Sequence, residues 1–357
     1  MVRETQVSSG LFDRVYHAVY DDVSAYTAEA IATCLLNGGL DFQQGFTLED
    51  AWSQLHCAPE RQLQVAWALA YLEQQGYLQH VAGEWVGVER KHYAFGVGWN
   101  VQIQPSLDLI DFVASHWLDI IQGKVNSVHV LFGVEGAPLW ERYFSNSHDL
   151  YAVHNQWAAE RLADLMKAGQ TRTPAVLELG TGYGSATLAL LAECALRSQL
   201  LERSVLTDIS AALANRARKR LAPSYPAVRL ESGKLDIDAH HLERERSFDY
   251  IFAVNVLHCA RDIVETLKRL RTYLKPGGTL LLSECMRKDY ACLLHQEFIF
   301  SLLPNFGLIQ RGASGAPCFG FWSCGDWQAF MEAAGYQSIQ VVENEGQQIL
   351  GGLIIGR

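Results

Sequence analysis

The sequence predicts an α/β protein in which a mainly parallel sheet follows a smaller, mainly helical domain. From Ala175 onward, short apolar segments alternate with helical patterns, which indicates a parallel sheet covered by helices on both faces. Residues 1–91 show helical patterns instead. The length of 357 residues exceeds that of one ordinary domain, so we expect one large domain and one smaller one.

The chain divides into three predicted segments. Residues 1–91 form a winged-helix-like helical domain, and residues 92–172 form a helical connector and pocket lid. The stretch "TRTPA" at 171–175 marks the start of the sheet domain, which spans 173–357 and contains a lid insertion at 286–324. We expect the first segment to serve in dimerisation or in covering the substrate.

Helix start and stop signals define the elements of the first segment. Residues 21–36 carry apolar side chains at helical spacing and are followed by "NGG". Thr47 opens the next helix with an aspartate three residues on, and a further helix runs from Pro59 to Gly76. "YLQHVAGEWVGV" then alternates around an Ala-Gly turn, which predicts a hairpin. Together these elements predict a winged helix-turn-helix.

Charge argues against DNA as the partner of this winged helix. Residues 1–91 contain five Lys and Arg side chains against twelve Asp and Glu, and the whole chain has a net charge of −10. Neutralisation of phosphates supplies most non-specific affinity for DNA, and this segment cannot supply it. We therefore expect no nucleic-acid partner and favour a homodimer contact or a substrate cover.

The sequence shows no sign of a membrane span, a signal peptide or a zinc site. The sequence lacks a run of about eighteen apolar residues, and its start "MVRETQVSSGLF" has no apolar core of a signal peptide. Eight cysteines are scattered without a C-x-x-C pair, which predicts reduced thiols and no zinc site. We expect a cytoplasmic protein with neither a membrane partner nor a metal.

The sheet domain follows a regular order of elements. Strands are predicted at 175–179, 203–209, 227–237, 248–257 and 279–285, with helices from Ser185, at 211–222 and at 260–274. After the insertion, a helix at 325–335 precedes two closing strands at 338–344 and 347–356, which we expect to form a hairpin with an antiparallel last strand. The connector contributes two helices, at 106–123 and 154–169. Its aromatic residues Tyr143, Phe144 and Tyr151 favour core packing over substrate contact, and Tyr151 stays a candidate for such contact.

The stretch "LELGTGYGSATLALL" points to a ligand at the first strand–helix turn. Gly180, Gly182 and Gly184 follow the spacing G-x-G-x-G, whereas dinucleotide-binding turns follow G-x-G-x-x-G and hold a pyrophosphate. Glu178 precedes the first glycine by two residues and favours a ligand that carries an ammonium group. These features predict the amino-acid part of S-adenosylmethionine.

Carboxylates at the next two strand ends extend this site. Asp208 in "LTDIS" can accept hydrogen bonds from both ribose hydroxyls, and Asp236 in "KLDID" can receive the adenine amino group. The strand ends of an open α/β sheet meet at one edge, where ligands bind. A purely structural alternative assigns the glycines to packing and Asp208 to a helix cap. The complete predicted cofactor set is Glu178, Gly180, Gly182, Gly184, Asp208, Ile209, Asp236, Ile237 and Asn255.

These motifs resemble those of the class I S-adenosylmethionine-dependent methyltransferases, and more narrowly the C-methyltransferase domains of polyketide synthases. The resemblance extends over about 175–335 and includes "FAVNVLHCARDIVETLKRLRTYLKPGGTLLLSE", "HQEFIFSLL" and "WSCGDWQAFMEAAGY". It implies a Rossmann-like class I methyltransferase sheet. The N-terminal module is similar to that of small-molecule O-methyltransferases, which implies a homodimer. No acyl-carrier or ketosynthase sequence accompanies these motifs, so we expect a freestanding enzyme.

His258 and Glu284 are the predicted catalytic residues. His258 follows the fourth strand beside the expected cofactor, and an imidazole has the near-neutral pKa of a general base. Both resembled families place a catalytic histidine there, and Glu284 matches its acidic partner in the polyketide family. A carboxylate in that place would orient the imidazole. The alternatives are a helix-capping histidine and a solvated carboxylate.

The insertion contributes His295 and Glu297 as candidate substrate residues, since it should cap the pocket. Two histidines do not make a metal site, so no metal is predicted. Arg261, Arg287, Lys288 and Arg311 could form a basic patch for an acidic carrier protein, but we interpret them as isolated solvated charges.

The sequence therefore predicts a methyltransferase that acts on a small organic acceptor in specialised metabolism. C-methylation at an acidic carbon, such as the α-position of a β-keto compound, is favoured. O-methylation of a phenol, enol or carboxylate is the alternative, because the same histidine can deprotonate oxygen. A non-catalytic cofactor-binding regulator and a nucleotide-dependent oxidoreductase are the rivals of other classes. The acceptor's identity, and whether it arrives free or tethered to a carrier, stay open.

Overall fold

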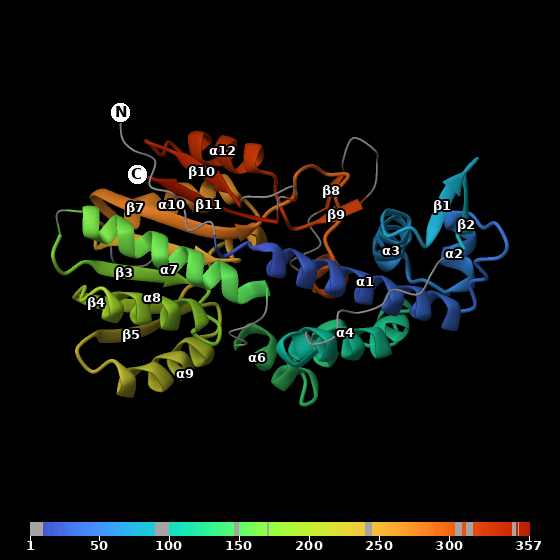
Figure 1. The fold of residues 1–357 in the computed structure, drawn as a ribbon, viewed down its shortest axis with the longest axis horizontal. Coiled ribbons are helices and arrows are strands. Elements are labelled where there is room, and N and C mark those ends of the chain that lie inside the picture. The colour runs from blue at the N-terminus through green and yellow to red at the C-terminus, as the bar shows by residue number, and fades with distance from the viewer. Residues whose placement is uncertain are drawn as a thin grey trace. The chain divides into compact units, whose positions relative to one another are not determined.

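A computed structural model describes residues 10–89, 100–145, 150–169, 171–239, 245–303, 309–311, 317–344, 348 and 350–357. The chain divides into two compact units (Figure 1). Unit 1 comprises 1–13, 150–288 and 321–357, and unit 2 comprises 14–149 and 289–320.

A seven-stranded sheet forms the centre of unit 1. Its strand order is β10-β11-β7-β6-β3-β4-β5. The five strands from β7 to β5 are parallel, whereas β11 is antiparallel to both of its neighbours. The strand bounds are β3 Ala175–Leu179, β4 Arg203–Asp208, β5 Arg229–Lys234, β6 Phe248–Val254, β7 Leu274–Cys285, β10 Gln340–Glu343 and β11 Gly351–Gly356. This topology confirms the predicted parallel sheet and its antiparallel closing hairpin.

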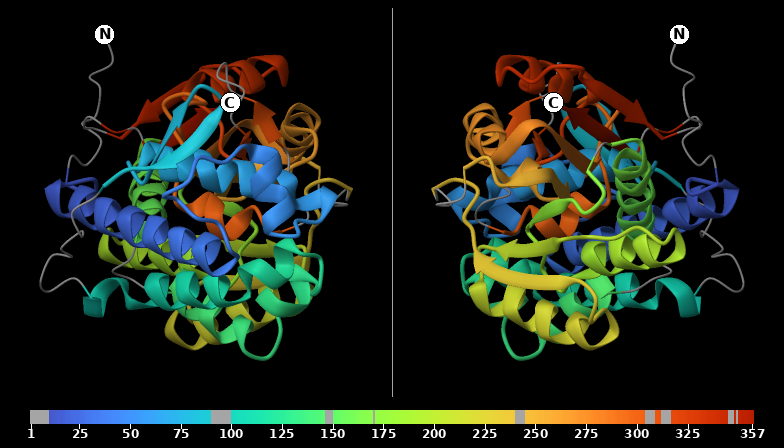
Figure 2. Two further views of the ribbon diagram at one scale, coloured as in Figure 1. Left: turned by 90° about the vertical axis from the view of Figure 1, so that its right-hand side faces the viewer. Right: turned by 90° about the vertical axis from the view of Figure 1, so that its left-hand side faces the viewer.

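Helices cover both faces of this sheet. Side chains alternate between the faces along a strand. On β7, Leu280 and Leu282 join a cluster with residues of α10 (Ile263–Tyr273) and α12 (Cys324–Ala333). Ser283, one position further along, contacts His154 of α7 (Leu150–Ala168), which packs against α8 (Ser185–Leu196). At the β5 edge, α9 (Ala211–Leu221) lies along β4 and β5 (Figure 2).

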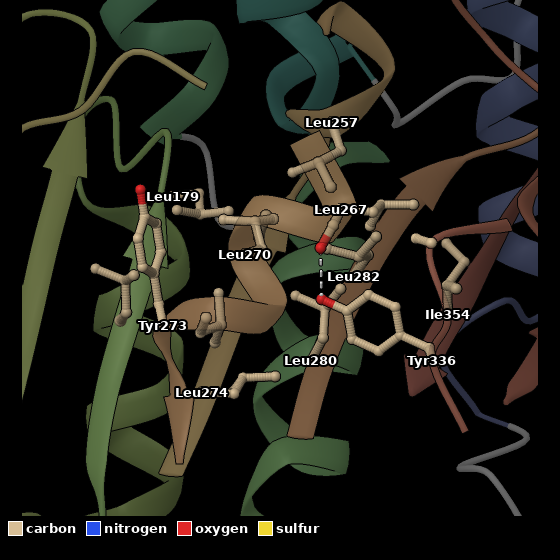
Figure 3. Packing of buried hydrophobic residues seen from close by; sticks show 14 of the residues in the cluster. Leu179, Leu257, Leu267, Leu270, Tyr273, Leu274, Leu280, Leu282, Tyr336 and Ile354 are labelled. Atoms are coloured by element: carbon tan, nitrogen blue, oxygen red, sulfur yellow. Dashed lines mark hydrogen bonds between the residues drawn. The ribbon is translucent and has the colours of Figure 1, made fainter. Parts of the chain in front are cut away.

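A buried apolar cluster of unit 1 joins residues of β3, β6 and β7 to residues of α10 and α12. Figure 3 shows part of this cluster, including Leu267 of α10 and Leu282 of β7. Leu267 and Leu282 are fully buried, and Tyr336 packs beside them. The Tyr336 hydroxyl donates a hydrogen bond to the Leu267 carbonyl at 3.1 Å, so its one polar atom is satisfied inside the apolar cluster.

Unit 2 is mainly helical. Its helices are α1 Arg14–Asn37, α2 Leu48–Gln54, η1 Pro59–Arg61, α3 Gln62–Gln74, α4 Asn100–Ile121, α5 Ser127–Leu131, α6 Gly136–Ser145 and α11 Gln296–Phe300. Two hairpins accompany them, β1 Leu78–Val81 with β2 Glu84–Gly87, and β8 Ile309–Arg311 with β9 Pro317–Phe319. Helix α1 packs against α4, and α3 packs against β9.

Local signals predicted the elements of residues 14–87 well. Thr47 and Asp50 form a capping box at the start of α2, as expected. In the first hairpin, Ala82 and Gly83 both have positive φ, 52° and 91°, which suits a two-residue hairpin turn. The elements match those of a winged helix, and that name for the module stays a prediction.

Three features differ from the expected elements. The "KPGG" turn lies within β7, where the pairing passes from Phe248–Leu274 to Tyr250–Thr279 and leaves the intervening residues outside the ladder. The aromatic stretch of the connector forms part of α6, which we did not predict. The compact units also divide the chain at 149/150 rather than at 172/173, because α7 packs on α8 and β7.

The insertion is divided as well. Residues 289–320 belong to unit 2, whereas the predicted lid insertion at 286–324 was counted with the sheet domain. The roles assigned to 1–91, 92–172 and 173–357 stay predictions. In the part of the chain that the structure describes, no helix has the length and apolar character needed to cross a membrane.

Replacing Leu282 tests the core of unit 1. We expect Leu282→Ala to lower the free energy of unfolding by about 2–5 kcal/mol, because it leaves a cavity among fully buried side chains. Leu188→Ala is the control: its side chain is 42% exposed, so a change within about 0.5 kcal/mol is expected. Urea unfolding followed by circular dichroism measures both, and equal losses would contradict the placement of Leu282.

Candidate active site

The carboxyl ends of the parallel strands bring the predicted residues together. β3, β4, β6 and β7 end at Leu179, Asp208, Val254 and Cys285. Because these strands run in one direction, their ends share one edge of the sheet. Glu178, Asp208, Asn255 and Glu284 lie in or just after these strand ends, and His258 follows on a short 3-10 helix, η3 (Leu257–Cys259).

The three glycines of the first turn serve different purposes. All have positive φ, 60° at Gly180, 51° at Gly182 and 83° at Gly184. A Cβ at Gly180 would lie 2.5 Å from the Val256 side chain, and one at Gly184 would lie 3.0 Å from Ala217. A Cβ at Gly182 would meet no described atom within 4 Å. Packing therefore explains two of the glycines, and Gly182 leaves open space beside the backbone.

Glu178 is a buried carboxylate at this turn. Its side chain is 1% exposed and accepts a hydrogen bond from the Thr187 hydroxyl. Burial raises the pKa of Glu178 to about 7, against the opposing effect of its hydrogen bonds. A ligand ammonium group would favour the charged form and would itself be held by it.

Asp208 and Asp236 organise the next two strand ends. Asp208 accepts hydrogen bonds from the backbone N–H groups of Gly182 at 3.0 Å and Ser210 at 2.8 Å, which connects the glycine turn to β4. Asp236 accepts one from the backbone N–H of Asp238 at 2.9 Å. Each carboxylate retains lone pairs for further donors. Beside Asp208, Ile209 is 60% exposed and offers an apolar surface.

These residues fit S-adenosylmethionine. Glu178 suits its ammonium group, Asp208 suits vicinal hydroxyls, and the open space at Gly182 lets a ligand approach bare backbone. The exposed Ile209 side chain suits one face of an adenine ring. Ile237 is only partly buried and packs at the rim of the apolar core. The assignment of these residues to the cofactor stays a prediction.

His258 and Glu284 form a buried pair. His258 Nδ1 lies 2.6 Å from Glu284 Oε2, and the two side chains are 6% and 0% exposed. Glu284 Oε1 accepts hydrogen bonds from the backbone N–H groups of Val256 at 3.1 Å and Leu257 at 2.8 Å. One carboxylate therefore fixes both the loop that carries the histidine and the imidazole itself.

The carboxylate also sets the basicity of the imidazole. Burial by itself lowers the pKa of His258, and the charges of Cys259 and Glu284 raise it by more, to about 10. Of these two groups, the Glu284 carboxylate is the one whose oxygen lies 2.6 Å from the imidazole nitrogen Nδ1. The contact with Glu284 therefore makes this imidazole more basic than an isolated one.

Asn255 connects the ends of β6 and β7. Its Oδ1 accepts a hydrogen bond from the backbone N–H of Cys285 at 2.6 Å, and its own N–H donates to the Ser283 carbonyl at 2.8 Å. Its φ is +54°, a conformation that asparagine tolerates better than most residues.

The sequence did not predict two side chains that lie near His258 and Glu284. The Phe321 ring lies 5.0 Å from the His258 ring, at an interplanar angle of 43°. Arg287 donates from Nε to the Phe321 carbonyl at 2.7 Å and is completely buried. This corrects the interpretation of Arg287 as a solvated charge or part of a surface patch. The segment "CFGFW", aromatic and just before a capped helix, was the one local signal that could have indicated Phe321.

The candidate substrate residues lie in buried surroundings. Tyr151 on α7 is 6% exposed, with its ring 6.5 Å from that of His154. Within unit 2, His295 Nδ1 lies 3.1 Å from Ser24 Oγ. Glu297 accepts hydrogen bonds from Trp67 Nε1 at 3.2 Å and from the Leu294 N–H at 2.8 Å. Through these contacts, His295 and Glu297 help to hold unit 2 together. Their contact with substrate stays a prediction.

Buried histidines elsewhere in the described ranges do not form a metal site. His154 is buried against Ser283, and burial lowers its pKa to about 4. Burial likewise lowers the pKa of His295 to about 3. Among the described residues, no group of three or more His, Cys, Asp or Glu side chains could hold a metal ion.

Comparison with known proteins identifies the fold and its cofactor. Residues 177–280 match a family model described as a methyltransferase domain. The chain therefore contains a methyltransferase domain, and its cofactor is S-adenosylmethionine. The methyltransferase superimposes on the DszA carbon methyltransferase with a TM-score of 0.76, at 18% identity, covering 96% of this chain and 91% of that one. The citrinin polyketide synthase CMeT domain gives 0.76 at 21% identity, covering 95% and 89%.

Several curated relatives are polyketide synthases. The methyltransferase is 32% identical over 232 residues to the highly reducing polyketide synthase ALT1 of Alternaria alternata, which covers 63% of this chain and 8% of that protein. The highly reducing polyketide synthase easB of Emericella nidulans is 29% identical over 246 residues, covering 65% and 9%. The chain therefore spans about a tenth of the length of these relatives. The trans-methyltransferase CalH, solved with SAH, gives a TM-score of 0.58 at 20% identity, covering 96% and 89%.

Replacing Glu284 by glutamine tests the electrostatic role of the pair. We expect the pKa of His258 to fall in Glu284→Gln, because burial then acts without the opposing carboxylate. The amide oxygen can still accept from Val256 and Leu257. Histidine side-chain NMR over a pH series measures the shift, with the exposed Glu202→Gln as a charge-matched control.

The same pair has a pH-dependent effect on stability. Because the pKa of His258 is raised above 6.5, its stabilisation is complete below that pH and is lost as pH rises through about 10. The stability difference between the wild type and Glu284→Gln should shrink over that range. A constant difference would count against the pair.

A matched pair of glycine variants tests the cofactor turn. Gly182 and Gly277 both have positive φ, and at neither position would a Cβ meet a described atom within 4 Å. Alanine at either position should therefore carry a similar backbone cost, of order 1 kcal/mol. We expect only Gly182→Ala to weaken binding of S-adenosylhomocysteine in calorimetry, by at least about tenfold, because its methyl group enters the ligand's space. Equal affinities of the two variants would remove Gly182 from the site.

Proposed function

We propose that the chain catalyses C-methylation at an acidic carbon of a small organic acceptor, such as the α-position of a β-keto compound, in polyketide-like metabolism. The observation that carries this proposal is the buried contact of 2.6 Å between His258 Nδ1 and Glu284 Oε2 at the carboxyl edge of the sheet. A strong base is what removal of a carbon-bound proton requires. The similarity to polyketide synthases supports the class of acceptor.

In this proposal the neutral form of His258 is the general base. Glu284 holds the Nδ1 position, so the proton of the acceptor is taken by Nε2. The buried carboxylate stabilises the imidazolium that forms. When bound, S-adenosylmethionine supplies a methyl group on a positively charged sulfur.

The remaining residues position the reactants. Glu178 binds the ammonium group, Asp208 the ribose hydroxyls and Asp236 the adenine amino group. Orientation of this kind can contribute about 7–11 kcal/mol to a two-reactant step. Phe321, packed against His258, shields the base from water and keeps its ring in place.

We propose further that the acceptor arrives as a thioester on an acyl carrier, since the relatives are multidomain polyketide synthases. We also propose that the protein forms a homodimer and that it is located in the cytoplasm. Comparing a carrier-bound β-keto thioester with its free N-acetylcysteamine analogue tests the tethered form, which should show the higher kcat/KM.

His258→Ala tests the base. We expect it to slow methyl transfer by about 10²–10⁴-fold while S-adenosylhomocysteine still binds, because the histidine is not in the predicted cofactor set. The surface-exposed His129→Ala is the control and should leave turnover unchanged. Transfer from methyl-labelled cofactor, followed by NMR location of the label, measures both activity and position.

A label on oxygen would replace C-methylation by O-methylation. Retained turnover in His258→Ala would remove the base assignment. Cofactor binding without turnover of any β-keto, phenol or enol acceptor would favour a non-catalytic regulator.

A further inference from the structure

We propose that Asn255 is a catalytic residue whose Nδ2 group donates a hydrogen bond to the enolate oxygen formed when His258 deprotonates the acceptor. The inference rests on the proposed C-methylation and assigns the site a ligand class, a carbonyl oxygen that becomes negatively charged. It gives Asn255 a different role from the cofactor contact that the sequence predicts.

The orientation of the Asn255 amide is fixed by its neighbour. A backbone N–H can only donate, so the amide atom 2.6 Å from the Cys285 nitrogen must be the oxygen Oδ1. The nitrogen Nδ2 therefore points away from Cys285. It is buried and, among the residues that the structure describes, has no hydrogen-bond partner.

An unpartnered buried donor is costly. Leaving such a group unsatisfied costs about 1–3 kcal/mol, so its presence calls for an explanation. The backbone of Asn255 adds a second constraint, since its φ is +54°. Glycine and aspartate also tolerate this conformation, but of these three residues only asparagine provides a side-chain N–H.

The amide and the imidazole are held by adjacent residues of β7. The Glu284 side chain orients His258, and the next residue, Cys285, orients Asn255 through its backbone N–H. Asn255 and His258 are also three residues apart at the exit of β6. The base and the donor therefore sit on one rigid support and need no rearrangement during the reaction, which is what makes oxyanion donors effective.

His258 Nε2 takes the α-proton, and the C–H electron pair forms a carbon–carbon double bond as the carbonyl electrons move to oxygen. Asn255 Nδ2 donates its hydrogen bond to that oxygen. The enolate carbon then forms the new carbon–carbon bond to the methyl group, while the pair of the breaking C–S bond remains on sulfur. His258 releases its proton to solvent.

Deuterium exchange isolates the enolate step from methyl transfer. The wild-type protein, saturated with S-adenosylhomocysteine, is mixed with acetoacetyl-N-acetylcysteamine in D2O, and exchange at the α-carbon is followed by NMR above the enzyme-free rate. Calorimetry measures S-adenosylhomocysteine affinity in parallel. The variants are Asn255→Asp, which keeps an acceptor for Cys285, and Asn255→Gly, which tolerates positive φ without adding charge.

We expect both variants to slow exchange by about 10²–10³-fold, with S-adenosylhomocysteine affinity unchanged. Exchange at the wild-type rate in both folded variants would overturn the inference. A loss of affinity with normal exchange would also overturn it and return Asn255 to the cofactor set. Absence of exchange in the wild type, with methyl transfer to oxygen, would instead defeat the proposed C-methylation itself.

Discussion

The arrangement of the active edge depends on one buried carboxylate. Glu284 has no exposed surface, yet it accepts three hydrogen bonds, from two backbone N–H groups and from His258. An isolated buried charge would be strongly destabilising, and such a carboxylate is tolerated only because donors surround it. The same three bonds determine where the chain runs after β6. Removing the whole side chain would therefore disturb the loop, the orientation of His258 and the proton affinity of its imidazole together.

The sheet provides the frame on which this carboxylate acts. Parallel strands place Glu178, Asp208 and Glu284 at one edge although they are far apart in the chain. The hydrogen bond from Gly182 to Asp208 then joins the first turn to the second strand end. The glycine turn follows β3, and η3, which carries the proposed base, follows the neighbouring strand β6. The topology therefore places the proposed cofactor site and the proposed base beside each other.

Most of the features that could be predicted from the sequence are those that depend on residues close together in the chain. The strands, the glycine turn and the capping box each depend on residues close in sequence, and the structure has them where expected. His258 and Glu284 were predicted as partners because their family resemblance places them so, and their side chains do meet. Phe321 and Arg287 were missed because their contacts join the end of β7 to a segment that returns more than thirty residues later. The periodicity of a sequence indicates local structure and cannot predict contacts between such distant segments. The burial of His295 and Glu297 likewise depends on partners in α1 and α3.

A double-mutant cycle on methyl transfer tests most directly whether Glu284 acts through His258. Rates are compared for the wild type, His258→Ala, Glu284→Gln and the double variant. If the carboxylate works by orienting and charging the imidazole, glutamine slows the wild-type reaction but adds nothing once the histidine is gone. Independent, multiplying losses from the two substitutions would contradict the account.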